Sequence, residues 1–323
     1  MRAILADRHG GPEVLRLVER DLPVPGPGQL LVDVAAAGVN FADIYRRQGL
    51  RPYAGDAPFV IGSEGSGTVV AAGPDTGGLD RGDRVAWADV PGSYAEQVIV
   101  PADRAVPVPD GVDLDAAAAV MLQGMTAQYL SHDTYPVAPG DAVVVHAAAG
   151  GVGLLLTQMV KMRGGVVIAT TSTLPKAELA KDMGADYLAG YDDFGAVTRD
   201  ATGGDGAAVV YDGIGQATFD DSLSALRRRG YMVLYGAASG PVPPVDPQRL
   251  AAAGSLYLTR PTLVSYIVTR DELLSRADAL FRWIRQGALR VSVGGRYPLD
   301  QAARAQEDLA SRRTTGKLIL SPR

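Results

Sequence analysis

The chain has 323 residues, of which 47% are hydrophobic and 21% charged, and its formal net charge is −5. These values are ordinary for a folded globular protein, and the length favours two domains over one. The absence of cysteine excludes disulfides, thiolate catalysis and sulfur-ligated zinc.

His9, His132 and His146 are too scattered to predict a metal site and are expected to be structural. No run of basic residues marks a nucleic-acid-binding arm, and no window of about 18 apolar residues indicates a membrane span. The N-terminus lacks a hydrophobic signal core. We therefore expect a cytoplasmic protein whose partners are small molecules or other subunits, not nucleic acid or membrane.

The first 124 residues contain short apolar runs broken by glycine and proline. The runs are RAILA, EVLRLVE, QLLVDVAAAGV, GTVVAAG, DRVAWADV and YAEQVIV. Such short runs with frequent turn signals predict an irregular antiparallel β domain.

From residue 125 the pattern changes to alternating strands and helices. Strands are expected at 143–146, 166–171, 186–190, 207–212, 231–236 and 255–259, with helices over 152–162, 176–183, 194–201 and 218–226. Six apolar strands with intervening helices predict an α/β fold with a parallel, doubly wound sheet. Two further helices, near 271–286 and 300–311, precede a last strand, LIL. This tail should complete the first domain, because it has no sheet of its own.

A small-residue turn follows the first strand of the alternating region. In VVVHAAAGGVG, Ala148, Gly150 and Gly153 match the pattern A-x-G-x-x-G, a variant of the dinucleotide fingerprint. Gly150 and Gly151 would let the backbone approach a pyrophosphate, and Gly153 would let the helix pack close to the strand. The helix N-terminus would offer free N–H groups to the phosphates. A turn in this position predicts a dinucleotide site.

The next strand lacks the carboxylate that binds the ribose of NAD roughly 20 residues after the glycine turn. Residues 166–172 read VVIATTS, and Lys176 follows. A carboxylate here would repel a 2′-phosphate, whereas the Ser172 hydroxyl and the Lys176 ammonium group would bind it. We therefore expect NADPH in preference to NADH. Alternatively, Lys176 is only solvated on its helix. Tyr191 either covers the adenine end of the coenzyme or is a packing residue.

The run GDAVVVHAAAGGVGLLLTQMVK, residues 140–161, resembles the fingerprint of the quinone oxidoreductase and zeta-crystallin branch of the medium-chain dehydrogenase/reductases. Similar blocks extend over nearly the whole chain, namely HGGPEVL, GVNFADIYRRQGL, GDRV, VVYDGIG, RRGYMVLYGAASG, GSLYLTRPTL and SRRTTGK. The resemblance implies a GroES-like domain from residues 1–124 and 263–323 and a Rossmann NADPH-binding domain from 125–262, with the coenzyme in the cleft between them. It also implies a homodimer joined at SLYLT, since an open apolar edge needs cover.

Zinc-dependent relatives place metal ligands where this chain has none. Ser63 stands at the histidine of their Gly-His-Glu block, Asn40 stands at a cysteine, and a second cysteine is missing around Gln123 and Gly124. Catalytic zinc needs three protein ligands, so no metal is expected. Glu64 is expected to have a structural role, holding loop amides.

The resemblance and the missing ligands predict metal-free hydride transfer from NADPH to a quinone, which spreads the incoming charge over its ring and second oxygen. Asn40 and Tyr45 are the candidate catalytic residues, donating to the acceptor oxygen or holding the nicotinamide; alternatively, they only brace the domain core. The cofactor contacts implied by the resemblance are Asn40, Phe41, Tyr45, Thr126, Tyr129, Gly150, Gly151, Val152, Ser172, Lys176, Tyr191, Gly213, Tyr235, Gly236, Ala237, Ala238, Pro261, Thr262, Leu263 and Arg312.

One departure from close bacterial relatives bears on the acceptor. Arg51, with Tyr53 two positions on, stands where they place an aromatic residue. Two other functions stay open. The same hydride could reduce α,β-unsaturated ketones or aldehydes, or the chain could have a non-catalytic role, crystallin-like or RNA-binding. The acidic balance argues against RNA.

Overall fold

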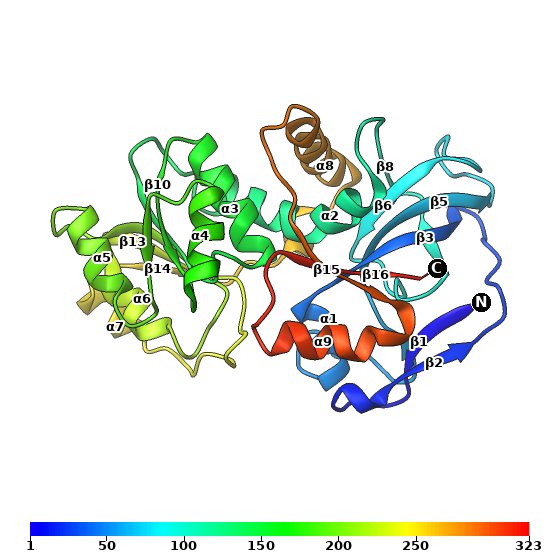
Figure 1. The fold of residues 1–323 in the computed structure, drawn as a ribbon, viewed down its shortest axis with the longest axis horizontal. Coiled ribbons are helices and arrows are strands. Elements are labelled where there is room, and N and C mark those ends of the chain that lie inside the picture. Colours follow the sequence, from blue (N-terminus) through cyan, green and yellow to red (C-terminus); the bar gives the residue numbers. More distant parts are fainter. Residues whose placement is uncertain (323) are drawn as a thin grey trace. The chain divides into compact units, whose positions relative to one another are not determined.

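The structure, a computed structural model, describes residues 1–322. It divides into two compact units, one formed by Met1–Leu122 together with the segment from Ile267 onward, and the other by Gln123–Tyr266. Both chain ends therefore belong to the first unit (Figure 1). Helix α2, Leu114–Tyr129, carries the chain from the first unit into the second.

The first unit consists mainly of two β-sheets. One has the order β15-β16-β3-β5-β6-β8, with β7 also paired to β3, and the other has the order β2-β1-β4. The strands are β1 Arg2–Ala6, β2 Leu15–Glu19, β3 Gln29–Val39, β4 Phe59–Val60, β5 Glu64–Ala72, β6 Arg84–Ala88, β7 Gln97–Pro101, β8 Val106–Pro107, β15 Val293–Pro298 and β16 Lys317–Ser321; the helices are α1 Phe41–Gln48, α8 Arg270–Arg285 and α9 Ala302–Ala310.

The C-terminal segment adds two strands to this unit. Strand β16 pairs antiparallel with β3, so that Ile319 lies opposite Gly38. Strand β15, which sequence analysis did not predict, pairs in parallel with β16. Its glycines, Gly294 and Gly295, interrupt the alternation of apolar and polar residues by which strands are recognised.

The second unit contains the predicted parallel sheet of six strands, in the order β11-β10-β9-β12-β13-β14. The strands are β9 Ala142–Val145, β10 Val166–Thr170, β11 Tyr187–Ala189, β12 Ala207–Asp212, β13 Leu226–Leu234 and β14 Tyr257–Thr259; the helices are α3 Gly151–Met162, α4 Leu174–Asp182, α5 Phe194–Ala201, α6 Phe219–Ala225 and the unpredicted α7 Pro247–Ala252. The α/β fold class is therefore confirmed.

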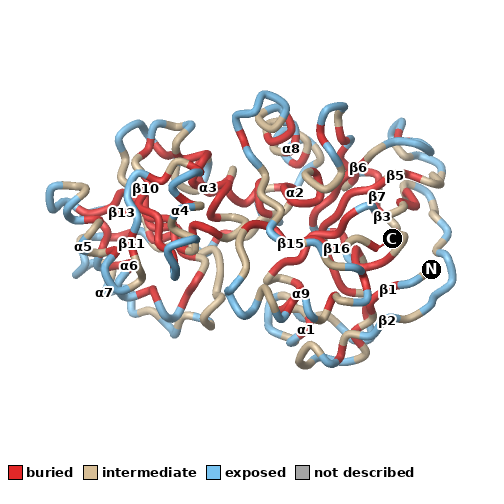
Figure 2. The backbone as a smooth tube through the Cα atoms, viewed as in Figure 1, coloured by how far each residue is buried: buried red, intermediate tan, exposed pale blue. Residues whose placement is uncertain are grey.

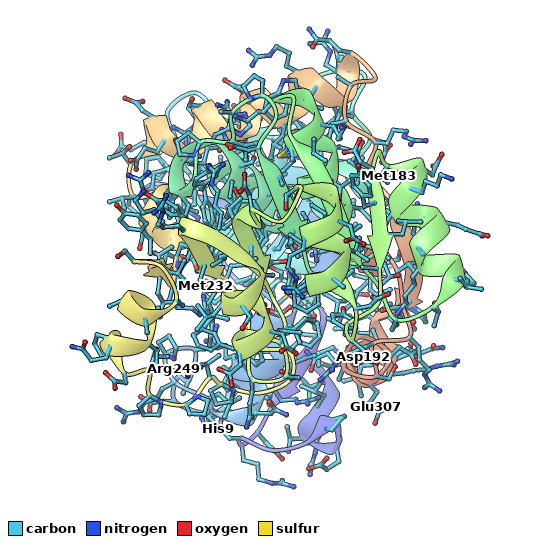
Figure 3. All side chains as sticks on the ribbon, turned by 90° about the vertical axis from the view of Figure 1, so that its left-hand side faces the viewer. His9, Met183, Asp192, Met232, Arg249 and Glu307 are labelled. Carbon is cyan, nitrogen blue, oxygen red and sulfur yellow. The ribbon has the colours of Figure 1, made fainter. Side chains whose placement is uncertain are left out.

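Burial explains why these strands are so apolar. Every residue of β12 and the three valines of β9 are buried, and Figure 2 shows the buried segments of the second unit at its sheet and along α3. Central parallel strands are covered on both faces, which removes the need for polar alternation. In β13, Met232 lies among buried side chains, while Arg249 on α7 is exposed (Figure 3). Among the described helices, none is both long and apolar enough to cross a bilayer.

Candidate functional site

The glycine turn joins β9 to α3 at the carboxyl edge of the parallel sheet. A Cβ on Gly153 would lie 2.4 Å from the Ala147 carbonyl oxygen and 2.7 Å from the Ala148 Cα. Because these are backbone atoms of the preceding turn, any side chain at Gly153 would push the helix away from the strand. The predicted packing role of Gly153 is confirmed.

Gly150 and Gly151 lie at the N-terminus of α3, where the first N–H groups have no partner within the helix. A Cβ on Gly151 would lie 1.7 Å from Oε1 of Gln123, a buried atom with no hydrogen-bond partner among the described residues. Sequence analysis missed Gln123 as a neighbour of this turn. The backbone N–H groups at this helix N-terminus are donors and fit a phosphate-bearing coenzyme, whereas the Gln123 oxygen is an acceptor and would need a donor group of the ligand.

The two predicted ligands of a 2′-phosphate lie together beyond the end of β10. Nζ of Lys176, on α4, is 3.5 Å from Oγ of the exposed Ser172. Partial burial lowers the pKa of Lys176. The long separation makes this a weak contact.

A second group of predicted cofactor residues surrounds the turn after β12. A Cβ on Gly213 would lie 2.8 Å from the Tyr235 ring, and one on Gly236 would lie 2.5 Å from the Gly213 carbonyl oxygen. Burial raises the pKa of Tyr235, and the charges of Asp212, Tyr191 and Tyr129 raise it further.

The remaining predicted contacts of this unit are spread along the chain. Thr126 and Tyr129 are buried on α2, and Tyr129 stacks on Tyr266 with ring centroids 4.1 Å apart. Val152 is the second residue of α3, Ala237 and Ala238 lie shortly after Tyr235, and Pro261, Thr262 and Leu263 follow β14. Arg312 belongs to the first unit, where it is exposed just after α9 in a left-handed conformation with φ of 57°.

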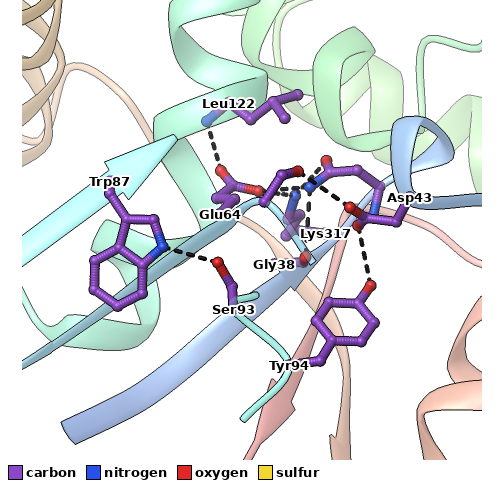
Figure 4. A network of polar contacts seen from close by, with 10 residues as sticks. Gly38, Asp43, Glu64, Trp87, Ser93, Tyr94, Leu122 and Lys317 are labelled. Atoms are coloured by element: carbon purple, nitrogen blue, oxygen red, sulfur yellow. Dashed lines mark hydrogen bonds and ion pairs between the residues drawn. The ribbon is translucent and has the colours of Figure 1, made fainter. Parts of the chain in front are cut away.

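The first unit contains a buried polar network, formed by Asn40, Asp43, Glu64, Tyr94 and Lys317 (Figure 4). Lys317 is 1% exposed, and its Nζ lies 2.7 Å from Asn40 Oδ1 and 2.5 Å from Glu64 Oε2. Asn40 Nδ2 donates to the same Glu64 oxygen at 2.9 Å. The cation and the carboxylate therefore fix which end of the Asn40 amide is oxygen and which is nitrogen.

The network gives Asn40 and Glu64 defined structural tasks. Glu64 also accepts from the backbone N–H of Leu122, so its predicted structural role is confirmed, although this amide lies in α2 and not in a loop. The second N–H of Asn40 points to the Gly38 carbonyl at 3.4 Å. Whether Asn40 also contacts a substrate stays a prediction.

Asp43 lies in the first turn of α1, three residues after Asn40, and accepts three hydrogen bonds. The donors are the backbone N–H of Asn40 at 3.0 Å, the Tyr94 hydroxyl at 3.0 Å and the Ser63 hydroxyl at 3.1 Å. Burial raises the pKa of Asp43 to about 6, against the opposing effect of Lys317 and these donors. Ser63 therefore supports a carboxylate. Within residues 1–322, no three His, Cys, Asp or Glu side chains are grouped as metal ligands.

Tyr45, the other candidate catalytic residue, belongs to an aromatic group on the first two turns of α1 and the loop beyond it. Its ring centroid lies 6.1 Å from that of Phe41 and 5.3 Å from that of Tyr53. Tyr45 and Phe41 are partly exposed, whereas Asn40 is buried. The two candidates thus lie close in sequence but in different surroundings.

Comparison with known proteins gives consistent matches over both units. Residues 26–110 match the alcohol dehydrogenase GroES-like domain family, and residues 151–282 match the zinc-binding dehydrogenase family. The chain is 44% identical over 317 residues to a quinone oxidoreductase of Pseudomonas aeruginosa, covering 97% of each chain. It is 40% identical over 329 residues to a 2-haloacrylate reductase of a Burkholderia species, covering 99% of this chain and 98% of the relative.

Solved structures agree with these matches. The crystal structure of Escherichia coli quinone oxidoreductase complexed with NADPH has a TM-score of 0.97 at 39% identity, with all of both chains covered. A mycobacterial protein complexed with NADPH has a TM-score of 0.96 at 50% identity, again with full coverage.

We predict that Lys317→Met destabilises the protein by about 3–5 kcal/mol, because it leaves the Glu64 carboxylate buried without its cation. The double variant Lys317→Met/Glu64→Gln removes the charge of both partners of this pair and should recover most of that loss. Urea unfolding measures both.

The matched control is Arg296→Met, which breaks the largely exposed ion pair with Asp115 and should change the free energy of unfolding by about 1 kcal/mol or less. Equal small losses in Lys317→Met and Arg296→Met would contradict the assigned importance of the buried pair.

The raised pKa of Asp43 predicts a pH dependence of stability. Between the ordinary value of 3.8 and about 6, the folded chain holds this proton while the unfolded chain releases it. The contribution of Asp43 to the free energy of unfolding therefore falls as the pH rises through this window. Asp43→Asn should remove that part of the slope, whatever the stability of the variant itself.

Urea unfolding at a series of pH values across the window measures this slope. Asn in place of the exposed Asp221 is the control and should leave the slope unchanged. An identical slope in the wild type and in Asp43→Asn would show that Asp43 does not titrate there.

Proposed function

The chain belongs to the quinone oxidoreductase branch of the medium-chain dehydrogenase/reductases, and from this membership we propose that it reduces quinones with NADPH. The glycine turn at a helix N-terminus, with Ser172 and Lys176 at the end of the neighbouring strand, is the observation that carries the coenzyme assignment. The relatives of known structure that bind NADPH support it.

The second unit would bind the coenzyme at the carboxyl edge of its sheet. The N–H groups of Gly151 and Val152 would hold the pyrophosphate, with the dipole of α3 favouring its negative charge. Ser172 would donate a hydrogen bond to the 2′-phosphate, and Lys176 would supply the positive charge. When bound, NADPH supplies the hydride. Tyr191, Gly213 and the turn from Tyr235 to Ala238 would line the adenine and ribose portions.

The first unit would act on the acceptor. Tyr45 is partly exposed and carries a hydroxyl, so it would donate a hydrogen bond to the quinone oxygen as negative charge develops there. Asn40 would present an amide whose orientation is fixed by Lys317 and Glu64. Phe41 and Arg312 are further proposed contacts. Two positions that hold zinc ligands in metal-dependent relatives would be occupied here by Asn40, a member of the buried polar network, and by Ser63, which donates a hydrogen bond to Asp43 of that network.

A second candidate is the reduction of conjugated carbon–carbon bonds. The 2-haloacrylate reductase among the relatives favours it, because the compound in its name carries a double bond conjugated to a carboxylate. Arg51 is exposed in the loop that carries Tyr53, and its charge would attract anionic acceptors of this type.

We also propose a cytoplasmic homodimer joined along β14. This strand is an edge of the six-stranded sheet, and it presents the half-exposed Tyr257, which stacks on Tyr231 with ring centroids 4.5 Å apart. An edge strand of this kind is a template for pairing with a second copy.

We expect NADPH to support faster turnover than NADH with naphthoquinone as acceptor, because only NADPH carries the 2′-phosphate. Steady-state kinetics with naphthoquinone, benzoquinone and a 2-enal, each with both coenzymes, test this expectation. Higher kcat/KM with the 2-enal would favour the second candidate. No turnover of any acceptor with NADPH would contradict both and favour a non-catalytic role.

We predict that Lys176→Ala raises the KM for NADPH about tenfold while leaving the KM for NADH unchanged, because a hydrogen bond to a charged group is lost only with the phosphorylated coenzyme. Lys181→Ala is the matched control, since Lys181 lies on the same helix in its last turn. Equal effects of Lys176→Ala on both coenzymes would show that Lys176 does not bind the 2′-phosphate.

A further inference from the structure

A buried chain of hydrogen bonds crosses the carboxyl edge of the parallel sheet through His146. Its Nδ1 lies 2.8 Å from Thr170 Oγ1, its Nε2 lies 2.9 Å from Ser222 Oγ, and Ser222 Oγ donates to Asp212 Oδ2 at 3.2 Å. All four side chains are fully buried. We call these residues, Asp212, Ser222, His146 and Thr170, the His146 chain.

Because the carboxylate of Asp212 can only accept hydrogen bonds, it determines which group donates and which accepts in each hydrogen bond of the His146 chain. Oδ1 of Asp212 accepts from the N–H groups of Ile214 and Gly215, and Oδ2 accepts from the hydroxyls of Thr218 and Ser222. Since Ser222 spends its one hydroxyl proton on Asp212, its oxygen must accept from Nε2–H of His146.

The opposite nitrogen of the ring follows from this. With the proton on Nε2, Nδ1 of a neutral ring is an acceptor, and it accepts a hydrogen bond from the Thr170 hydroxyl. Burial lowers the pKa of His146, against the opposing charge of Asp212, which favours the neutral ring. His146 therefore acts as one donor and one acceptor in fixed positions.

Two residues of the His146 chain, Asp212 and Thr170, hydrogen-bond to loops that are proposed to bind the coenzyme. Asp212 holds the turn that contains Gly213 through the N–H groups of Ile214 and Gly215. The carbonyl of Thr170 accepts from the N–H of Ala148 in the glycine turn at 3.1 Å, and Thr170 lies two residues before Ser172.

The third loop meets the ring itself. The imidazole stacks against Tyr191, with ring centroids 6.0 Å apart and an interplanar angle of 28°. The ring thus contacts Thr170 at the end of β10 and Tyr191 after β11, and through Ser222 it is connected to Asp212 at the end of β12. We propose that His146 is a positioning residue for the coenzyme, which holds these three loops in register and so sets both the affinity for NADPH and the preference over NADH. This inference rests on the proposed function.

A histidine that only filled space would behave differently. Phe194 packs edge-on against the ring at 4.8 Å, so the site is already aromatic and would accept phenylalanine. His146→Phe keeps the ring and removes both hydrogen bonds. His146→Gln loses the ring but keeps one donor and one acceptor in a single planar group. The two variants therefore separate packing from hydrogen bonding.

The experiment measures dissociation constants of NADPH and NADH by fluorescence titration of the full chain, without turnover. We expect His146→Phe to raise the NADPH constant about tenfold, because two hydrogen bonds are lost, and to reduce the ratio between the coenzymes. His146→Gln should stay within about threefold of the wild type. Thr198→Val, which removes another buried hydroxyl of the same unit, is the control and should change neither constant.

Thermal unfolding checks that each variant is folded. If His146→Phe fails to fold, Thr170→Val decides the question, since it removes only the donor to Nδ1 and should raise the NADPH constant about fivefold. Unchanged constants in a folded His146→Phe or in Thr170→Val, or equal losses in His146→Phe and His146→Gln, would overturn the inference. A wild-type chain that does not bind NADPH would instead overturn the proposed function, and the inference with it.

Discussion

The pairing of one buried ammonium group organises the first unit. Lys317 has almost no contact with water, and a charge in that position is tolerated only with a partner and full hydrogen bonding. Glu64 supplies the charge, and Asn40 supplies a carbonyl oxygen. The three residues come from β16, from β5 and from the junction of β3 with α1, so the pairing ties together the strands on which the candidate acceptor residues depend.

The second unit also contains a buried polar network, but this network has no lysine or arginine. The loops that follow parallel strands lie at the carboxyl edge of the sheet, where ligands bind in folds of this class. The His146 chain consists of one carboxylate, two hydroxyls and one imidazole, each with a defined donor or acceptor role. In both units, buried polar groups that hydrogen-bond to one another lie close in sequence or by contact to residues proposed to meet ligands.

The parts of the fold and site that follow local rules could be predicted. The parallel sheet was predicted because strands buried on both faces are continuously apolar and alternate with helices. Gly153 and the pair formed by Ser172 and Lys176 were found because each acts within one strand-turn-helix segment. Strand β15 was missed because Gly294 and Gly295 hide its period.

The parts that depend on distant pairing could not be predicted. Lys317 is 277 residues from Asn40, and no spacing in the sequence connects them. Its only local signal is a charged residue at the start of an apolar strand, KLILS. His146 was expected to be structural, but its partners Thr170 and Ser222 lie 24 and 76 residues away, so the loops it connects became visible only in the folded unit.

The position of β16 also orders events during synthesis. All six strands of the second unit lie between residues 123 and 266, so this unit can close its sheet while the ribosome is still translating the rest. The first unit cannot complete its sheet so early, because the partner of Glu64, Lys317, is synthesised more than 250 residues later. Until then the Glu64 carboxylate must stay hydrated, and residues 37–39 of the nascent β3 lack the pairing that β16 provides. The middle of the chain can therefore mature before its beginning.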